Sequence, residues 1–291
     1  MHGKVCLITG ANRGVGKATT LALASMGATV VMVARDPALG TAARDEIIRT
    51  AGNQSVELLV ADLASLEAVR QLAADFRERH SQLHVLINNA GLTKRHHVLT
   101  EDGFETTFAV NHLAPFLLTN LLLDLMKAGA PARIINVSSM VHKWGRINSG
   151  DLQSEQHYNM HIAYNQSKLA NVLFTYELAR RLEGSGITAN VVHPGMVASD
   201  FAREYTGFIG FMAQKGWRPF MKSPEKGAAT SVYLASAPEV EGVTGKYFAN
   251  SREKKSSRTS SNVALAGRLW ETSEQLTGLA NALKTEKHAN I

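Results

Sequence analysis

The chain has 291 residues, of which 45 % are hydrophobic, and its formal net charge is +6 at pH 7. This length suits one large α/β domain, and this hydrophobic fraction excludes a wholly disordered chain. The single cysteine, Cys6, excludes an internal disulfide and indicates a reducing compartment.

The sequence does not indicate a membrane protein, a nucleic-acid-binding protein or a metal-binding protein. The run from Lys4 enters a strand-like segment without a signal peptide's apolar core, and the longest apolar run, FLLTNLLLDLM, contains Asp124. That run is shorter than the ~18 residues that span a bilayer. The basic residues gather only in SREKKSSR (251–258), which we interpret as a solvated loop rather than a DNA-binding arm. We expect a cytoplasmic protein without a transmembrane segment, a nucleic-acid partner or a metal site.

Strand-like and helix-like segments alternate along the chain. Apolar runs typical of strands lie at 4–10, 28–35, 55–63, 84–91, 132–139, 187–195 and 245–250. Helical patterns lie at 17–27, after Asp36-Pro37, at 65–80, 101–127 and 164–182, and after Ser223-Pro224. The strands are continuously apolar, as expected when helices cover both faces of a parallel sheet. The pattern predicts a single Rossmann-type, doubly wound α/β domain over 1–291 with about seven strands.

A glycine-rich turn, TGANRGVG, follows the first strand. Its candidate cofactor-binding residues are Gly10, Asn12, Arg13, Gly14, Val15 and Gly16. Glycines allow a tight turn there, and the helix that follows favours a negative group at its N-terminus. Asn12 occupies the middle glycine position of the usual dinucleotide fingerprint, and such turns also occur without a nucleotide. The position of the glycine-rich turn at the first strand-to-helix junction favours binding of a dinucleotide.

The end of the second strand bears on the choice of cofactor. An acidic residue there would suit a free ribose 2′-hydroxyl, but the chain has Arg35, with Asp36 one step later. Arg35 and Arg13 match a 2′-phosphate, because guanidinium groups pair well with phosphate oxygens. In the alternative interpretation Arg35 is merely solvent-exposed. We predict NADP(H) rather than NAD, with Asp36 capping the helix that Pro37 opens.

The remaining strand ends supply further candidates, because ligands of such sheets bind outside the carboxyl ends of the strands. Asp62 and Leu63 follow strand three, and Ser138 and Ser139 follow strand five. The other candidate cofactor residues are Asn89, Ala90 and Gly91 after strand four, and Pro194, Gly195 and Val197 after strand six.

Tyr164 and Lys168 are four residues apart in AYNQSKLANVLF and therefore share one helix face. Tyrosine alone loses its proton only near pH ~10, but a neighbouring ammonium favours the phenolate. Such a pair can act as the acid-base group that hydride transfer to a carbonyl requires. Alone the spacing is a chance pattern. Together with the glycine turn and the strand-five serines it predicts catalysis.

The segments TGANRGVG, NNAG, NVSS and YNQSK, in this order, resemble the short-chain dehydrogenase/reductase superfamily over about residues 3–250. VNHLAPFLLTNLL, INVSSM and SKLANVLFTYELARRL are similar to its retinol dehydrogenase-like branch, which includes WW-domain oxidoreductase. The resemblance implies that Tyr164 is the acid-base residue, Lys168 holds the nicotinamide ribose, Ser139 orients the substrate and Asn111 anchors a water in the proton relay.

The sequence also allows predictions for an insertion, a substrate lid and a C-terminal extension. The stretch between Ser139 and Tyr164 is longer than is typical of the superfamily, so 140–163 is expected to form a cleft wall in which His142 and Trp144 contact substrate or only pack. Residues 201–220 contain six aromatic residues. They predict a substrate lid over about 196–223; the alternatives are a membrane-surface patch, the interface of a homo-oligomer or core packing. A polar extension is expected over about 250–291.

Two function classes stay open. The first is an NADP(H)-dependent carbonyl reductase or alcohol dehydrogenase acting on a small lipophilic substrate. The second is a non-catalytic dinucleotide-binding redox regulator. Because a regulator needs no proton relay, the presence of Asn111, Ser139, Tyr164 and Lys168 together favours the enzyme.

Overall fold

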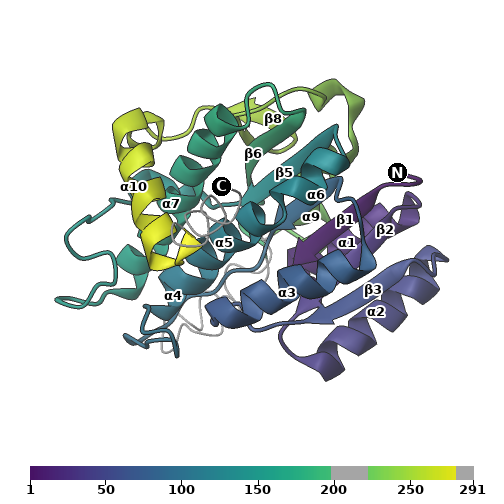
Figure 1. Ribbon diagram of the computed structural model, residues 1–291, viewed down its shortest axis with the longest axis horizontal. Helices are drawn as coiled ribbons and strands as arrows, with labels where there is room; N and C mark the ends of the chain where they lie inside the picture. Colours follow the sequence, from purple (N-terminus) through teal and green to yellow (C-terminus); the bar gives the residue numbers. More distant parts are fainter. Residues whose placement is uncertain (198–221, 280–291) are drawn as a thin grey trace, which may run out of the picture.

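The computed structural model describes residues 1–197 and 222–279, and a single parallel sheet lies at its centre (Figure 1). The strands are β1 (Val5–Thr9), β2 (Thr29–Ala34), β3 (Val56–Val60), β4 (Val85–Asn88), β5 (Ala132–Val137), β6 (Ile187–His193), β7 (Tyr247–Ala249) and β8 (Arg252–Lys254). Their order is β3-β2-β1-β4-β5-β6-β7-β8. This arrangement confirms the predicted doubly wound Rossmann-type domain.

The sheet has eight strands rather than the expected seven. The additional strand, β8, pairs antiparallel with β7 and belongs to the segment predicted as a solvated loop. Its three residues are exposed. The loop prediction was wrong for these residues, because solvation of the side chains does not prevent the backbone from forming an edge ladder.

Helices cover both faces of the sheet. They are α1 (Gly14–Ser25), α2 (Pro37–Ala51), α3 (Leu66–Arg79), α4 (Thr106–Phe108), α5 (Ala114–Leu121), α6 (Leu123–Ala128), α7 (Met160–Arg181), α9 (Pro224–Ser236) and α10 (Val263–Leu276). Side chains of α3, α5, α6, α7 and α10 join one apolar cluster, and those of α1, α2 and α9 join another. Within β1 the alternation is visible, since Leu7 belongs to the first cluster and Ile8 to the second. The continuous apolar strands are therefore buried on both sides.

The helix expected over 101–127 is interrupted. After α4 the chain forms a π-helical turn, η1 (Ala109–Leu113), before α5 and α6 continue. Pro115 has no N–H to give to the main-chain carbonyl of Asn111, four residues earlier, so regular α-helical bonding cannot run through this point. The break places a wider turn at Asn111.

The C-terminal extension is less polar in its packing than predicted. Helix α10 buries Trp270, which is only 5 % exposed, in the first apolar cluster, and it buries Ala266 and Leu269 in a third cluster with Leu169 and Leu173 of α7. In Figure 1 this helix, in yellow, lies beside α7. Helix α10 thus forms part of the core.

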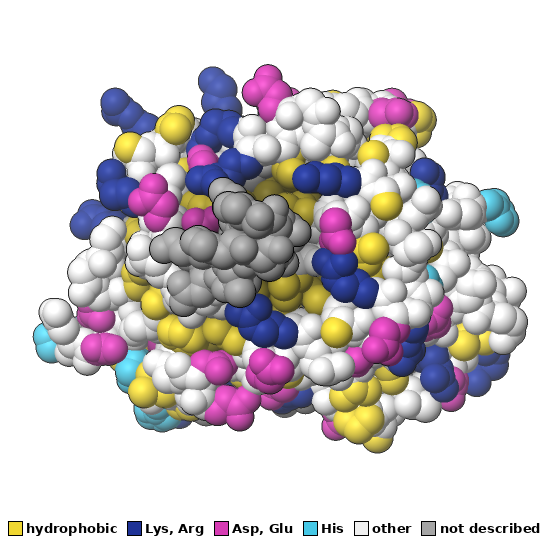
Figure 2. Space-filling model, viewed as in Figure 1, with side chains coloured by type: hydrophobic (Ala, Val, Ile, Leu, Met, Phe, Trp, Pro, Cys, Tyr) yellow, Lys and Arg dark blue, Asp and Glu magenta, His cyan; other side chains and the backbone are white. Residues whose placement is uncertain are grey.

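Charged side chains of both signs are interspersed over the face shown in Figure 2. Within 1–197 and 222–279, no helix combines the length and apolar character required to cross a bilayer. Nearly all of the predicted lid, residues 198–221, lies outside the described ranges.

Candidate active site

The turn after β1 depends on its glycines. Gly10 and Gly14 have positive φ angles of 64° and 53°, which side chains rarely adopt. A Cβ on Gly16 would lie 2.1 Å from the carbonyl oxygen of Gly10. Only glycine therefore lets the start of α1 approach the end of β1 so closely.

Residues after β4 hold this turn in place. The Asn89 side-chain amide donates to the carbonyls of Thr9 (2.8 Å) and Gly10 (3.2 Å). In return, the Thr9 hydroxyl oxygen accepts from the main-chain N–H groups of Asn89 and Ala90, each at 3.0 Å. These bonds tie the end of β4 to the glycine turn after β1.

The start of α1 fits a phosphate. Its N-cap residue is Arg13, whose side chain makes no capping hydrogen bond, so no side chain of the turn occupies the first N–H groups of the helix. Such groups, together with the helix dipole, attract anions. The turn therefore suits the pyrophosphate of a dinucleotide.

Arg35 and Asp36, at the end of β2, are both exposed but differ in their contacts. The Asp36 carboxylate accepts from the N–H groups of Ala38 (2.9 Å) and Leu39 (3.0 Å), which confirms the predicted cap of α2. Arg35 makes no hydrogen bond or ion pair with any residue of the described ranges. The carboxylate is thus committed to α2, and the guanidinium is available to a ligand.

The end of β3 lies beside the end of β2. Ala61, one residue before Asp62, donates its N–H to the Ala34 carbonyl at 3.0 Å, which places the β3 end next to Arg35. Asp62 itself accepts from the N–H of Ala64 (3.0 Å), and Leu63 is buried.

The segment after β6 approaches the glycine turn from the other side. A Cβ on Gly227 of α9 would lie 2.6 Å from Val197 Cγ2 and 3.0 Å from Val15 Cγ2, so both valines pack on this glycine. Gly195 has a φ of 95°, and the carbonyl of Pro194 accepts from Lys222 Nζ at 3.5 Å. The predicted residues Pro194, Gly195 and Val197 thus border the same edge of the sheet.

Tyr164 and Lys168 lie together on α7 as their spacing predicts. The Lys168 ammonium is 5.5 Å from the centre of the Tyr164 ring. Lys168 is only 3 % exposed, and burial lowers its pKa to about 8. Lys168 Nζ donates to the Val137 carbonyl at the end of β5 (3.3 Å). A Cβ on Gly91 would lie 3.2 Å from Nζ, so the β4 end is adjacent as well.

The two serines after β5 have different surroundings. Ser138 is buried and its hydroxyl donates to the Lys168 carbonyl at 2.7 Å. Ser139 is half-buried, and within the described ranges its hydroxyl takes part in one long bond, which it accepts from the N–H of Val141 at 3.4 Å. Ser138 is thus occupied in holding β5 to α7, whereas the hydroxyl proton of Ser139 remains available.

Asn111, in the π turn η1, joins three segments. Its amide nitrogen donates to the Leu92 carbonyl (2.8 Å) and to the Ser167 hydroxyl (3.0 Å), and its amide oxygen accepts from the Leu92 N–H (2.8 Å). Both side-chain N–H groups are therefore used. The main-chain carbonyl of Asn111 has no α-helical donor at Pro115, because proline has no N–H.

Within the insertion at 140–163, the two candidates for substrate contact differ. His142 lies in the 3₁₀ helix η2 (Met140–Trp144) and is fully buried, which favours the packing alternative. Trp144 is 64 % exposed.

A buried polar chain beneath these residues was not foreseen from the sequence. The Asn88 amide donates to Asn136 Oδ1 (2.7 Å) and to the Thr119 hydroxyl (2.9 Å), and the Asn136 amide donates to the Thr175 hydroxyl (2.9 Å). These bonds join β4 and β5 to α5 and α7. An asparagine inside each of two apolar strands was the available signal, because buried amides require partners.

The chain matches the family model described as short chain dehydrogenase over residues 4–208. It is 46 % identical to retinol dehydrogenase 14 of Homo sapiens over 297 residues, covering 96 % of this chain and 88 % of that protein. Among solved structures, an uncharacterised protein from Mycobacterium Paratuberculosis shares 37 % identity with a TM-score of 0.78, covering 95 % of this chain and 94 % of that one. The Pseudomonas aeruginosa RhlG/NADP active-site complex shares 27 % identity with a TM-score of 0.68, covering 85 % and 94 %.

The glycine turn, the tyrosine–lysine pair and these matches lead to one conclusion. The chain belongs to the short-chain dehydrogenase family, is retinol dehydrogenase-like, and is an oxidoreductase that acts on CH–OH groups with a nicotinamide dinucleotide as acceptor.

Proposed function

We propose that this chain interconverts a carbonyl and an alcohol on a small lipophilic substrate with NADP(H), with Tyr164 as the general acid and base. The observation that carries the proposal is the Tyr164–Lys168 pair, whose ammonium lies 5.5 Å from the phenol ring in a buried setting. The catalytic residues are Asn111, Ser139, Tyr164 and Lys168.

Each of these residues has a distinct task in the reductive direction. The hydroxyl of Ser139 holds the carbonyl oxygen of the substrate, and Tyr164 gives that oxygen its proton as negative charge develops on it. Bound NADPH supplies the hydride. Lys168, whose pKa of about 8 keeps it mostly protonated at neutral pH, stabilises the phenolate that remains. A water on the main-chain carbonyl of Asn111 returns a proton from solvent.

The cofactor residues are those that line the carboxyl edge of the sheet. The turn from Gly10 to Gly16 would hold the pyrophosphate, and Arg13 and Arg35 would pair with the 2′-phosphate. Asp62 and Leu63 would border the adenine, and residues Asn89–Gly91 and Pro194–Val197 would hold the nicotinamide half. A structural relative described as an NADP complex supports the choice of NADP(H).

A lipophilic substrate agrees with two features. Met140 follows Ser139, Met196 follows Gly195, and both methionine side chains are largely exposed. An apolar substrate would cover them and gain the transfer energy of burial. The curated relatives with 44–46 % identity are named as retinol dehydrogenases, whose name denotes a lipophilic alcohol.

The alternative is a dinucleotide-binding regulator without turnover. A screen of lipophilic aldehydes and ketones, followed by loss of NADPH absorbance, separates the two classes. Turnover of any of these carbonyls supports the enzyme, whereas tight NADPH binding without turnover supports the regulator.

Tyr164→Phe tests the acid-base role directly. The ring keeps its shape but loses its proton, so we expect kcat to fall by at least about 10²-fold while the Kd of NADPH changes by less than about twofold. Tyr233→Phe, on α9, is the matched control and should keep the wild-type rate. A Tyr164→Phe enzyme with more than a few per cent of the wild-type rate would exclude this residue as the general acid.

A further inference from the structure

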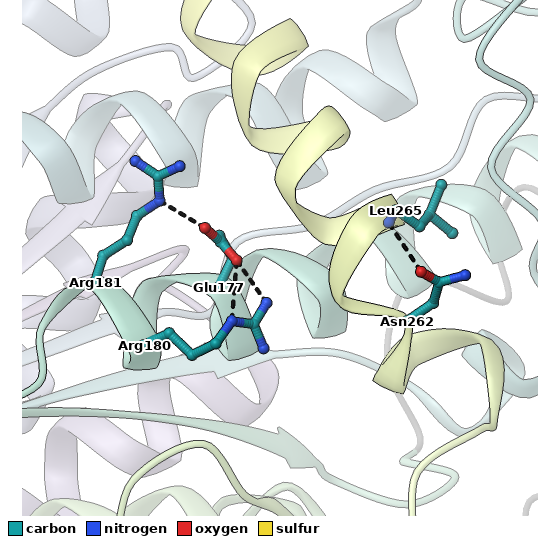
Figure 3. Close-up of polar contacts among 5 residues, drawn as sticks. All are labelled: Glu177, Arg180, Arg181, Asn262 and Leu265. Atoms are coloured by element: carbon teal, nitrogen blue, oxygen red, sulfur yellow. Dashed lines mark hydrogen bonds and ion pairs between the residues drawn. The ribbon is translucent and has the colours of Figure 1, made fainter.

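The C-terminal segment is firmly attached to the helix that carries Tyr164 and Lys168. The Trp270 ring of α10 lies 4.9 Å from Phe116 and 5.8 Å from Phe174, and the Arg181 guanidinium lies 4.2 Å from it. Figure 3 shows Glu177 between Arg180 and Arg181 at the end of α7, and Asn262 capping α10 through the N–H of Leu265 (3.0 Å). The α10 side of this contact, from Asn262 to Trp270, lies outside residues 4–208, which the family model matches.

His142 connects this segment to Ser139. Its Nδ1 lies 2.7 Å from the Ser139 carbonyl oxygen, and its Nε2 accepts from the Ser257 N–H at 3.1 Å. Because Nε2 accepts, the proton of the neutral ring is on Nδ1 and is donated to Ser139. The ring is fully buried and lies 4.9 Å from that of Tyr247. One histidine therefore fixes the Ser139 main chain relative to Ser257.

His112 makes the corresponding connection to Asn111. It follows Asn111 in η1 and is fully buried beside Phe108, at 5.0 Å between ring centres. A hydrogen bond of 2.9 Å joins His112 Nε2 to the hydroxyl of Ser273 on α10. The same hydroxyl lies 2.7 Å from the Leu269 carbonyl. The π turn is thus bonded to α10 through a single ring.

We propose that the segment from Ser256 to Ser273 positions the catalytic residues through two buried histidines, His142 acting on Ser139 and His112 acting on Asn111. Both are positioning residues, since each acts through a catalytic neighbour. The inference rests on the proposed roles of Ser139 and Asn111, and it assigns a part in catalysis to a region beyond the residues that carry the chemistry.

Replacement of Ser273 tests the connection to Asn111. Ser273→Ala removes the partner of His112, and Thr272→Ala removes an equivalent hydroxyl bond to the preceding turn, from Thr272 to Arg268, without a histidine. We expect Ser273→Ala to lower kcat about tenfold with little change in substrate KM or NADPH Kd, because small misplacement of reacting groups is costly. Thr272→Ala should stay within about twofold of wild type. Equal kcat values for the two variants would overturn this half of the proposal.

Replacement of His142 tests the connection to Ser139. His142→Leu removes both hydrogen bonds, whereas His142→Asn keeps an amide donor near the Nδ1 position and loses the bond to Ser257. Lys143→Ala, an exposed neighbour in η2, is the control. Lower kcat in His142→Leu, with partial recovery in His142→Asn, supports the proposal. A wild-type kcat in His142→Asn would show that the bond to Ser257 plays no part in positioning Ser139. A wild-type kcat in His142→Leu would overturn this half of the proposal.

Amide hydrogen exchange separates this inference from the proposed function. In His142→Leu the amides of 139–145 should exchange faster than in Lys143→Ala, and in Ser273→Ala those of 109–113 should exchange faster than in Thr272→Ala. If the wild-type protein turned over no carbonyl, the proposed function would fail while exchange still tested the connections. Unchanged exchange in both variants of an active enzyme would refute the inference alone. If Ser273→Ala did not fold, the His142 pair would decide.

Discussion

Lys168 is a cation in a setting where burial opposes charge. It is nearly inaccessible to solvent, its ammonium donates to the Val137 carbonyl, and desolvation lowers its pKa from 10.5 to about 8. In the proposed mechanism, the phenol of Tyr164 needs a positive neighbour during proton transfer, which would account for a lysine at this buried position. The buried ammonium therefore lowers the free energy of unfolding, and the size of this cost depends on pH.

Stability should rise with pH through the titration of Lys168. Between pH about 8 and 10.5 the unfolded chain holds a proton on this lysine that the native chain has released, so the unfolding free energy increases with pH across this window. Below pH 8 both states are protonated and the full cost of burial remains. Relative to Lys168→Met, wild type should gain up to about 3 kcal/mol across the window. Urea unfolding at a series of pH values measures the difference.

A matched control for that series is Lys226→Met, at an exposed lysine of α9. Its profile should follow that of wild type. A wild-type profile with the same slope as Lys168→Met would mean that the native lysine keeps its ordinary affinity for protons.

We expect Arg35 to determine the preference for NADPH over NADH. Its guanidinium has no partner in the described ranges and stands at the end of β2, so Arg35→Ala should weaken NADPH about tenfold or more and NADH little. Arg13→Ala should act in the same direction more mildly. Binding titrations of both cofactors at one fixed salt concentration measure the effect, because phosphate pairing is screened by salt.

The control for those titrations is Arg49→Ala, which removes an exposed arginine from the far end of α2. Equal losses for NADPH and NADH in Arg35→Ala would show that this arginine does not read the 2′-phosphate, and NADH would become the better candidate.

At the scale of an element, the start of α2 has a capping residue, Asp36, directly after a candidate cofactor residue, Arg35. The Asp36 carboxylate accepts hydrogen bonds from two N–H groups of α2, which hold it at the start of that helix. Asp36→Ala should cost about 0.5–2 kcal/mol of unfolding free energy, and Asp36→Asn much less, since asparagine also caps.

Neither Asp36 variant should weaken NADPH binding, because each removes a negative charge near the phosphate. Urea denaturation and NADPH titration of the two variants check both statements. Loss of NADPH affinity in Asp36→Asn would instead place the carboxylate in the cofactor site.

Sequence patterns predicted the strand ends better than the helix interiors. The strands end at glycine and polar residues after apolar runs, so the candidate residues from Gly10 to Gly195 could be named in advance. The break at Asn111 could not, because a π turn adds one residue without disturbing the apolar pattern, and Pro115 was its only signal. The polar composition around α10 concealed a helix whose few apolar residues lie on one face.

Finer assignments within the site required coordinates. The resemblance named Ser139 rather than Ser138, but the physical reason is the bond from Ser138 to the Lys168 carbonyl. Likewise, His142 was a candidate for substrate contact until its burial became visible. Such side-chain partners are long-range, and local sequence does not specify them.

At the scale of the whole molecule, parallel topology brings distant segments to one edge. The carboxyl ends of seven strands point in one direction. The candidate residues that follow these strands, from Gly10 to Val197, therefore lie along the same edge of the sheet although they are far apart in the sequence. The segment after β8 then returns to cover α7, and α10 supplies the last aromatic side chain of that face. The candidate site therefore depends on packing contributed by the end of the chain.

Trp270 allows this dependence to be measured. It is 5 % exposed and contacts Phe116, Phe174 and Arg181, so Trp270→Ala should lower the unfolding free energy by about 3–5 kcal/mol. Trp144→Ala removes the same side chain from a site that is 64 % exposed and should change it by less than about 0.5 kcal/mol. Urea denaturation followed by circular dichroism measures both. Similar values for the two variants would mean that α10 is not part of the cooperative core, and the site would then be complete without it.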